Sequence, residues 1–441
     1  MGHLQPVLLI AAALAERGHR VTVCVAACRS ELLSKQVAEL GCEMKGLPSN
    51  LTEEYCEDIK GWSFPEVAAW EYAPLLAFAS TEHGTPDVII SDIVSVAGHR
   101  VAQTMGVPLV LNVPLSIKLA LSGLPSLTNP LVRSILECRY HCGMVPVKPD
   151  SVNMIADYVV PAMQSNLVLI NSAWGLENPQ PCPPNVVVTG PLAPRGDSAK
   201  KLTRSAHGPI MDWMDSAPEG QAFAYVTTGS VTKLEPWQVR ALFEGLDACG
   251  CWVLWSLKDE ERAFLPVDPP PAKFFISPWM PQIELLAEPQ VKFVITHCGW
   301  GGTIECLSNG KPVIGFPGFG DQLPNSALLV RRGCGLALNP KAFTAAEVTR
   351  VATRLLDENA VFAARAVAMQ EALLATGGGA LAASSIESVV HHGVHHLIDH
   401  ERAGARAGAR ALQLVWHALA ILPRTVTLIL RCGHHLRSAL R

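Results

Sequence analysis

Short apolar runs and longer stretches with helical periodicity alternate along most of this chain. Runs rich in Val, Ile and Leu are typical of strands buried on both faces. Their alternation with helical stretches predicts an α/β protein with parallel sheets covered by helices. The predicted strands are Val21–Ala26, Asp87–Ser91, Pro108–Asn112, Asn166–Asn171, Asn185–Thr189, Ala222–Thr227, Trp252–Ser256, Lys273–Ile276, Val291–Thr296 and Pro312–Phe316. The predicted helices are Ser95–Met105, Pro236–Ala248, Thr303–Ser308, Asn325–Arg332 and Ala345–Leu356.

The pattern at the start of the chain is helical. Pro6 suits a first helical turn, Val7–Leu14 is apolar and helix-forming, and Gly18 suits the position after a helix end. A doubly wound sheet ordinarily has a strand before its first helix. We therefore expect a sheet that is one strand short, or a truncated sequence. No basic segment with a cleavage site is visible, so a signal peptide is not expected.

Composition narrows the functional classes. A chain of 441 residues suggests two domains, and 49% hydrophobic residues supply their cores. A formal net charge of -4 gives no reason to expect nucleic acid as a partner. Thirteen scattered cysteines, an odd number, fit no disulfide framework and indicate a reducing, cytoplasmic location. Their spacing matches no zinc site, so no metal is expected.

Composition also predicts the domain boundaries. The polar segment 191–209, rich in Pro, Gly and Ser, is expected to link an N-terminal domain, 1–190, to a C-terminal domain, 210–390. Residues 391–441 form a tail rich in His and Arg. Its apolar stretch is too short to span a bilayer, which takes about 20 residues. Two alternatives remain for the tail: a basic helix in peripheral contact with a membrane, or a solvated extension.

A glycine-rich turn follows one predicted strand of the C-terminal half. In parallel sheets, ligands bind beyond the carboxyl ends of the strands. After Val291–Thr296 comes His297, with Gly299, Gly301 and Gly302 ahead of a predicted helix. Glycines admit a ligand close to backbone N–H groups, and a helix N-terminus favours anions. The turn therefore predicts a diphosphate site, with Ser230 offering a donor from a second strand. The alternative is that these glycines only tighten packing.

The wider stretch carries a resemblance to a known family. Trp279-Met-Pro-Gln282, His297-Cys-Gly-Trp300, Glu305, Pro317 and Asp321-Gln322 occur in order over 44 residues. This set closely resembles the signature of the UDP-dependent glycosyltransferases of family 1. Gly2-His3 with Pro6 in the N-terminal half also fits. The resemblance implies a GT-B fold, in which two Rossmann-like parallel-sheet domains face each other across a cleft. It also implies a donor site in the C-terminal half and an acceptor site in the N-terminal half.

The resemblance assigns roles in donor binding to individual residues. It implies that Trp279 stacks on uracil, that Gln282 lies beside base and ribose, and that Glu305 accepts from the ribose hydroxyls. His297 and Ser230 would contact the phosphates, and Asp321 and Gln322 the sugar. The donor-binding turn comprises Gly299, Trp300, Gly301 and Gly302. Family members carry Asn after the tryptophan where this chain has Gly301-Gly302, so one phosphate-binding side chain is missing and backbone N–H groups would have to compensate.

Transfer to a hydroxyl requires a base near the acceptor and a stabilised leaving diphosphate. His3, at the start of the first helix, is the candidate base, and the helix dipole is expected to keep its ring neutral. Asp92 would accept the other ring N–H and fix the tautomer. The family places its catalytic His and Asp at these two motifs. The alternatives are that His3 is a frayed terminal residue and that Asp92 only caps a helix.

Taken together, the sequence predicts an inverting, metal-independent enzyme that needs no cofactor beyond its UDP-sugar. It would move a hexose to a hydroxyl of a small lipophilic acceptor, since residues 50–85 and 113–165 are apolar and irregular. Gln322 favours glucose, because galactose-using plant members often carry His there. Two other classes were weighed: a non-catalytic or truncated sugar-nucleotide-binding protein, and a nucleotide-dependent dehydrogenase. The second is disfavoured, because no Gly-x-Gly-x-x-Gly follows a first strand.

Overall fold

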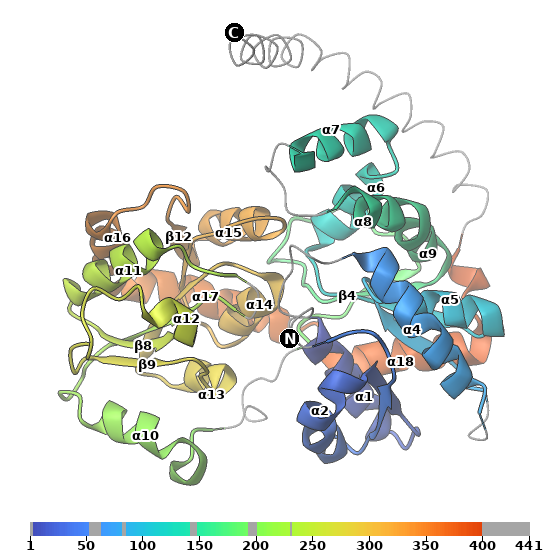
Figure 1. Cartoon of the computed structure of the whole chain (residues 1–441), viewed down its shortest axis with the longest axis horizontal. Helices are drawn as coiled ribbons and strands as arrows, with labels where there is room; N and C mark the ends of the chain where they lie inside the picture. The colour runs from blue at the N-terminus through green and yellow to red at the C-terminus, as the bar shows by residue number, and fades with distance from the viewer. Residues whose placement is uncertain are drawn as a thin grey trace. The chain divides into compact units, whose positions relative to one another are not determined.

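The computed structural model describes residues 3–52, 63–81, 85–141, 148–192, 201–229 and 232–398. The chain divides into two compact units, Met1–Gly393 and Val394–Arg441. All the sheets described below belong to the first unit (Figure 1). In the second unit, the described residues form a short 3-10 turn, η5 (His395–Leu397).

The described N-terminal half contains two separate parallel sheets. The first pairs β1 (Thr22–Ala26) with β2 (Glu43–Leu47). The second has the order β3-β4-β5-β6. Its strands are β3 (Ile89–Asp92), β4 (Leu109–Val113), β5 (Leu167–Ile170) and β6 (Val186–Val188). Every residue of β4 and β5 is buried, as expected for strands covered on both faces.

Helices cover these sheets. The first helix, α1, buries Leu8, Ile10, Ala11 and Leu14, and Leu8 and Ala11 belong to a core shared with β1. The bounds are α1 (Leu4–Ala15), α2 (Ala27–Glu39), α4 (Phe64–Ala79), α5 (Val96–Met105), η2 (Leu119–Gly123), α6 (Leu124–Ser126), α7 (Pro130–His141), α8 (Pro149–Met154), η3 (Ile155–Val159) and α9 (Val160–Ser165). The region expected to be irregular is thus largely helical where the structure describes it. Prolines at the first turns of α4, α8 and α9 favour helix starts there.

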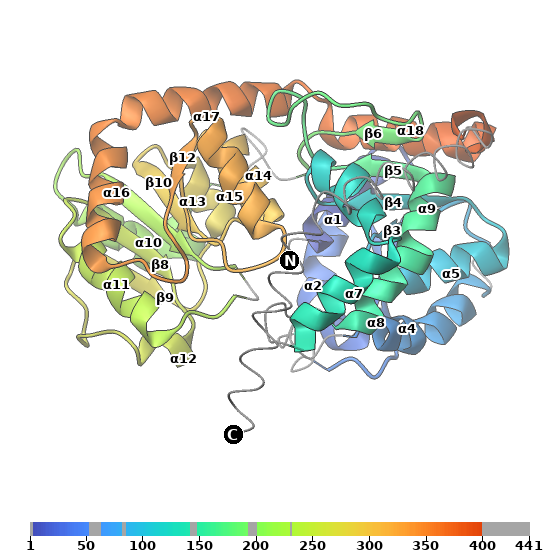
Figure 2. The same cartoon turned by 90° about the horizontal axis from the view of Figure 1, so that it is seen from above.

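The C-terminal half contains one six-stranded parallel sheet in the order β12-β11-β10-β7-β8-β9. Its strands are β7 (Phe223–Thr227), β8 (Trp252–Ser256), β9 (Phe274–Ser277), β10 (Val291–Thr296), β11 (Val313–Gly315) and β12 (Gly335–Ala337). Its helices are α10 (Arg204–Asp215), α11 (Pro236–Asp247), α12 (Asp259–Arg262), α13 (Gln282–Ala287), α14 (Trp300–Ser308), α15 (Gln322–Arg331) and α16 (Ala345–Asp357). Figure 2 shows these helices on both sides of the sheet.

The alternation of β7 explains why both faces of this sheet are apolar. Ala224 and Val226 join a core on one face, whereas Phe223 and Tyr225 join the core on the other. The carboxyl ends of β7 and β10 lie side by side, with Thr296 in register with Thr227. Loops that leave these two strands therefore meet at one edge of the sheet.

Two helices near the end of the first unit connect the halves. The helix α17 (Asn359–Leu374) packs against α14, and α18 (Gly378–His392) packs against α1. They are separated at Gly377, which has φ 104°. Among the described residues, Asn359–His392 is the stretch long and apolar enough to cross a membrane, but this is weak evidence because core helices pass the same test. The tail from residue 399 onward lies outside the described residues, so its membrane contact stays a prediction.

Several helix boundaries differ from those predicted, and α15 begins at Gln322 rather than Asn325. The helix α10 begins at Arg204, inside the expected linker, where Arg204 pairs with Asp212 and Asp215 on the same helix. The helix α14 begins at Trp300 rather than Thr303. Gly301 and Gly302 are poor helix formers and predicted a later start, but burial of Trp300 on the core extends the helix.

Candidate functional site

The loop between β10 and α14, predicted to bind a diphosphate, leads directly into a helix N-terminus. Gly299 is the N-cap of α14, and the first backbone N–H groups of a helix lack partners within it. His297 lies between two glycines: a Cβ on Gly229 would sit 2.6 Å from its Cε1, and one on Gly299 would sit 2.6 Å from its Nε2. Burial lowers the pKa of His297 to about 4, so the ring is neutral at pH 7 and keeps one N–H to donate.

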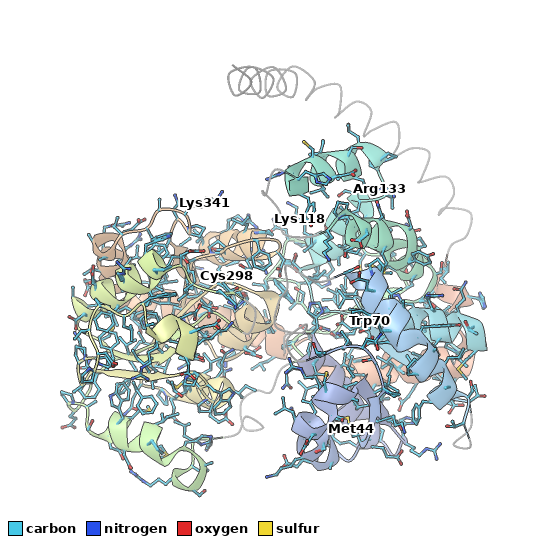
Figure 3. The ribbon with its side chains drawn as sticks, in the orientation of Figure 1. Met44, Trp70, Lys118, Arg133, Cys298 and Lys341 are labelled. Atoms are coloured by element: carbon cyan, nitrogen blue, oxygen red, sulfur yellow. The ribbon has the colours of Figure 1, made fainter. Side chains whose placement is uncertain are left out.

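Cys298 gives this loop its shape. It has φ 63°, a left-handed conformation that costs a residue with a Cβ, and it is fully buried beside α14 (Figure 3). The Nδ2 of Asn325 donates to the Cys298 carbonyl at 3.0 Å and to Oδ2 of Asp321 at 2.9 Å. Asn325 therefore couples the strained turn to Asp321. Nothing in the sequence singled it out, because the Cys298 carbonyl that it bonds lies on a different segment.

A hydrogen-bonded chain joins the residues predicted to bind the nucleoside. The Tyr225 hydroxyl donates to Oε1 of Gln282 at 3.2 Å, and Nε2 of Gln282 donates to Oε2 of Glu305 at 2.5 Å. Burial raises the pKa of Glu305, and the bond from Gln282 opposes that rise. Nearby in sequence, Trp279 is 69% exposed, which is unusual for a large apolar side chain and leaves a ring face free to stack.

Asp321 and Gln322 open the helix α15. Burial raises the pKa of Asp321, while its bond from Asn325 lowers it. Gln322 is buried, and its Oε1 accepts from the backbone N–H of Gly318 at 2.9 Å and of Phe319 at 3.2 Å. Its amide oxygen is therefore used by the preceding loop, and the Nε2 group is the part available to a sugar.

The two predicted catalytic residues lie together. Nδ1 of His3 is 2.9 Å from Oδ1 of Asp92, the last residue of β3. The ring of His3 is 49% exposed, whereas Asp92 is buried. Loss of solvent around the ring would lower the pKa of His3, but the charge and hydrogen bond of Asp92 outweigh this and raise it. The expectation that the helix dipole keeps this ring neutral is wrong in direction, because a full charge at hydrogen-bond distance exceeds a partial dipole charge.

Asp92 is held by more than His3. Its Oδ1 also accepts from the backbone N–H of Val94 at 3.1 Å, and its Oδ2 accepts from Nδ2 of Asn112 at 3.1 Å. The charge of Asp321, on the C-terminal half, also raises the pKa of His3. The candidate base and the candidate sugar-binding carboxylate are thus electrostatically coupled.

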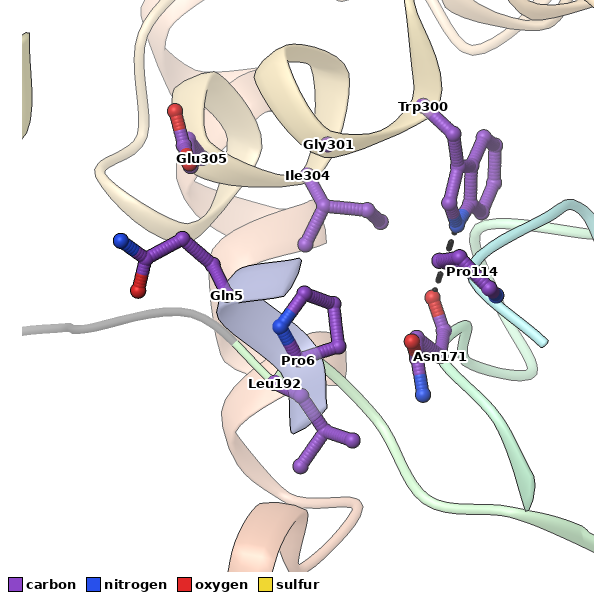
Figure 4. Close-up of a pocket in the computed structure, with 9 residues that line it drawn as sticks. All are labelled: Gln5, Pro6, Pro114, Asn171, Leu192, Trp300, Gly301, Ile304 and Glu305. Atoms are coloured by element: carbon purple, nitrogen blue, oxygen red, sulfur yellow. Dashed lines mark hydrogen bonds between the residues drawn. The ribbon is translucent and has the colours of Figure 1, made fainter. Parts of the chain in front are cut away.

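Trp300 lies at the joint between the halves. Its side chain is buried, and its indole Nε1 donates to the Asn171 carbonyl at 2.9 Å (Figure 4). The one indole donor is therefore not free for a ligand, and the predicted donor-binding role falls to the backbone at the helix start. A pocket of about 20 Å³, room for one water, lies beside it. Its lining residues are Gln5, Pro6, Pro114, Asn171, Leu192, Trp300, Gly301, Ile304 and Glu305.

A buried carboxylate near the joint was not foreseen from the sequence. Glu177 accepts from the backbone N–H of Ile117 at 2.6 Å and of Lys118 at 3.0 Å, and from the hydroxyl of Ser172. It thereby anchors the loop after β4 to the loop after β5. Ser230, predicted to contact phosphate, lies outside the described residues. Among the residues that are described, no group of three or more His, Cys, Asp or Glu is arranged to hold a metal ion.

Comparison with solved structures defines the class of fold. Os79 from O. sativa, solved in complex with U2F and trichothecene, superposes with a TM-score of 0.72 at 18% identity, over 88% of this chain and 98% of that one. The chain therefore has the GT-B fold of two Rossmann-like halves, as the sequence predicted.

Sequence comparison then gives the family. The sequence model for "UDP-glucoronosyl and UDP-glucosyl transferase" matches residues 149–367. A UDP-glycosyltransferase of Talaromyces amestolkiae is 27% identical over 360 residues, 68% of this chain and 64% of that protein. A flavonol 3-O-glucosyltransferase of Arabidopsis thaliana is 34% identical over 139 residues, 31% of this chain and 30% of that protein. The family model thus matches the C-terminal half together with the end of the N-terminal half, and the chain spans less than two thirds of the length of these curated relatives.

Proposed function

We propose that this protein transfers a hexose from a UDP-sugar to a hydroxyl of a small lipophilic acceptor. The observation that carries the proposal is the 2.9 Å contact between His3 and Asp92, electrostatically coupled to Asp321. This arrangement supports a site in which His3 would act as the base, Asp92 would orient it and Asp321 would bind the sugar. The names of the relatives, a UDP-glycosyltransferase and a flavonol glucosyltransferase, support the same class of reaction.

The proposed chemistry is a single displacement. Because Nδ1 of His3 bonds Asp92, its Nε2 is the nitrogen that accepts the proton of the acceptor hydroxyl. The hydroxyl oxygen forms a bond to the anomeric carbon of the sugar as the bond from that carbon to the diphosphate oxygen breaks. UDP leaves with the bonding electron pair, and the configuration at the anomeric carbon inverts.

Backbone donors would stabilise the leaving group. The N–H groups that open α14 and the neutral ring of His297 would donate hydrogen bonds to the diphosphate. These donors supply charge stabilisation without a metal ion, so we propose a metal-independent reaction. For the nucleoside, Glu305 keeps Oε1 for the ribose hydroxyls while Gln282 occupies Oε2. The free Nε2 group of Gln322 is consistent with a hydroxyl-rich sugar, and we propose glucose.

The test is a transfer assay on the full chain. UDP-glucose is incubated with a panel of flavonols, simple phenols and aliphatic alcohols, with and without a chelator. We expect glycoside and UDP to form in equal amounts, unaffected by the chelator. Binding of UDP without glycoside formation for any acceptor in the panel would instead identify a sugar-nucleotide-binding protein.

A further inference from the structure

A buried amide interrupts an apolar strand next to the candidate base. Asn112 lies in β4 between Leu111 and Val113, and all three residues are fully buried. An amide in such surroundings costs free energy unless its polar atoms are hydrogen-bonded. The Oδ1 of Asn112 has no hydrogen-bond partner, so packing alone does not explain an amide at this position.

The other end of the amide has a defined partner. Nδ2 of Asn112 donates to Oδ2 of Asp92 at 3.1 Å. The backbone fixes this pairing, because Asp92 and Asn112 are register partners in parallel strands and the Ile93 N–H donates to the Asn112 carbonyl at 2.9 Å. The contact is therefore set by the sheet rather than by a flexible loop.

The two carboxylate oxygens of Asp92 accept hydrogen bonds from different donors. Oδ2 receives Asn112, and Oδ1 receives His3 together with the Val94 N–H. The last torsion of an aspartate is broad, so a carboxylate bonded on one oxygen can turn. A donor on Oδ2 limits that rotation. Because an amide is neutral, it does not neutralise the negative charge of Asp92 that acts on His3. A Lys or Arg in its place would neutralise that charge.

We propose that Asn112 is a positioning residue that holds the Asp92 carboxylate in the orientation that aligns His3. The inference rests on the proposed function, because alignment of a base matters only if the base acts. The charged and titratable groups around Asp92 are His3 from α1, His99 from α5 and, through His3, Asp321. Burial lowers the pKa of His99, whose Nε2 is 3.3 Å from the Asp92 carbonyl, so this ring adds no competing charge at neutral pH.

The test replaces Asn112 by an apolar residue of similar size. In Asn112→Leu, the pKa of His3 should fall, because the aligned carboxylate that raises it is released. We measure this pKa by NMR of histidine-labelled full chain, with His3→Ala to assign the resonance. We expect kcat to fall roughly 10- to 100-fold, as for loss of a hydrogen bond to a charged group, while the dissociation constant of UDP changes by less than about twofold.

A matched control separates positioning from loss of stability. Asn185 is also a buried asparagine of the same half, but its Nδ2 donates to the carbonyls of Met163 and Asn166. Asn185→Leu should lower stability without changing the His3 pKa. If Asn112→Leu does not fold, Asn112→Ser serves in its place. The serine hydroxyl lies one bond closer to the backbone than the asparagine amide nitrogen and does not reach Oδ2 of Asp92.

The outcomes are distinct. A fall of the His3 pKa in the Asn112 variant, absent in the Asn185 variant, supports the inference. An unchanged His3 pKa in the folded Asn112 variant, or an equal shift in both variants, overturns it. If no form of the protein transfers sugar but the His3 pKa still falls only in the Asn112 variant, the positioning role stands and the proposed function fails.

Discussion

The proposed donor site and the proposed catalytic pair are built in different ways. In the C-terminal half, one continuous segment supplies strand, turn and helix start, so the proposed anion site is formed largely by backbone groups from His297 to Gly302. In the N-terminal half, the proposed chemistry depends on two side chains 89 residues apart, joined by one hydrogen bond. Backbone donors remain when a distant side chain is changed, whereas a site made of two side chains depends on each of them. Binding and catalysis should therefore be separable by mutation.

Removal of the base should have the largest effect. We expect His3→Ala to lower kcat by about 10²- to 10⁴-fold, the usual contribution of a general base, and to leave UDP binding unchanged. The matched control is His19→Ala, because His19 also lies within 2.9 Å of a carboxylate, that of Glu387. Steady-state kinetics and calorimetry with UDP measure the two quantities. Equal loss of activity in both variants would refute a specific role for His3.

Disruption of the proposed anion site should have the opposite signature, with UDP binding as the property that is lost. His297→Ala removes a donor to phosphate, and we expect UDP affinity to fall about 10- to 100-fold, or about 1.5–3 kcal/mol. Gly299→Ala should act in the same direction, because its Cβ would collide with the His297 ring. Gly250→Ala is the control, since a Cβ there meets no atom within 4 Å. Retention of full UDP affinity by both site variants would exclude the proposed anion site.

The pH dependence of sugar transfer should reveal the ionisation of His3 in its pair with Asp92. A base acts only when deprotonated, and Asp92 raises the pKa of His3 above its ordinary value of 6.5. Activity should therefore decline on acidification at a higher pH than for an unpaired histidine. In Asp92→Asn the acidic limb should move to lower pH, and the maximal rate should fall. An acidic limb at the same pH in both proteins would mean that the ionisation seen in the profile is not that of His3.

The smallest effect is expected at the nucleoside end. Tyr225→Phe removes only the hydroxyl that bonds Gln282, so UDP affinity should fall about 3- to 10-fold, the value of one neutral hydrogen bond. In a Gln282→Ala background the same change should have no effect on affinity. A penalty that persists there would show that Tyr225 acts through general packing and not through Gln282.

The same contrast explains what the sequence could and could not predict. The strands β8 and β10 were predicted to the residue, and the glycine turn was found, because contiguous residues carry both signals. The early start of α14 was missed, since burial of Trp300 outweighs the low helix propensity of its glycines.

Contacts between distant segments could not be predicted from the sequence either. Asn112 and Asn325 bond Asp92 and Cys298 from elements far away in the chain, and a strand pattern does not show which neighbour a buried amide will face. The raised pKa of His3 was missed for a related reason: the local helix dipole was visible in the sequence, but the distance to Asp92 was not.

The stereochemistry of the product tests the central claim most directly. If His3 activates the acceptor for one displacement, UDP-α-glucose must give a β-linked glucoside, and proton NMR of the purified product reads this from the anomeric coupling. The account predicts the β-glucoside from the wild-type chain and a rate of its formation about 10²- to 10⁴-fold lower in His3→Ala. An α-linked product, or wild-type yield of glucoside from His3→Ala, would contradict it.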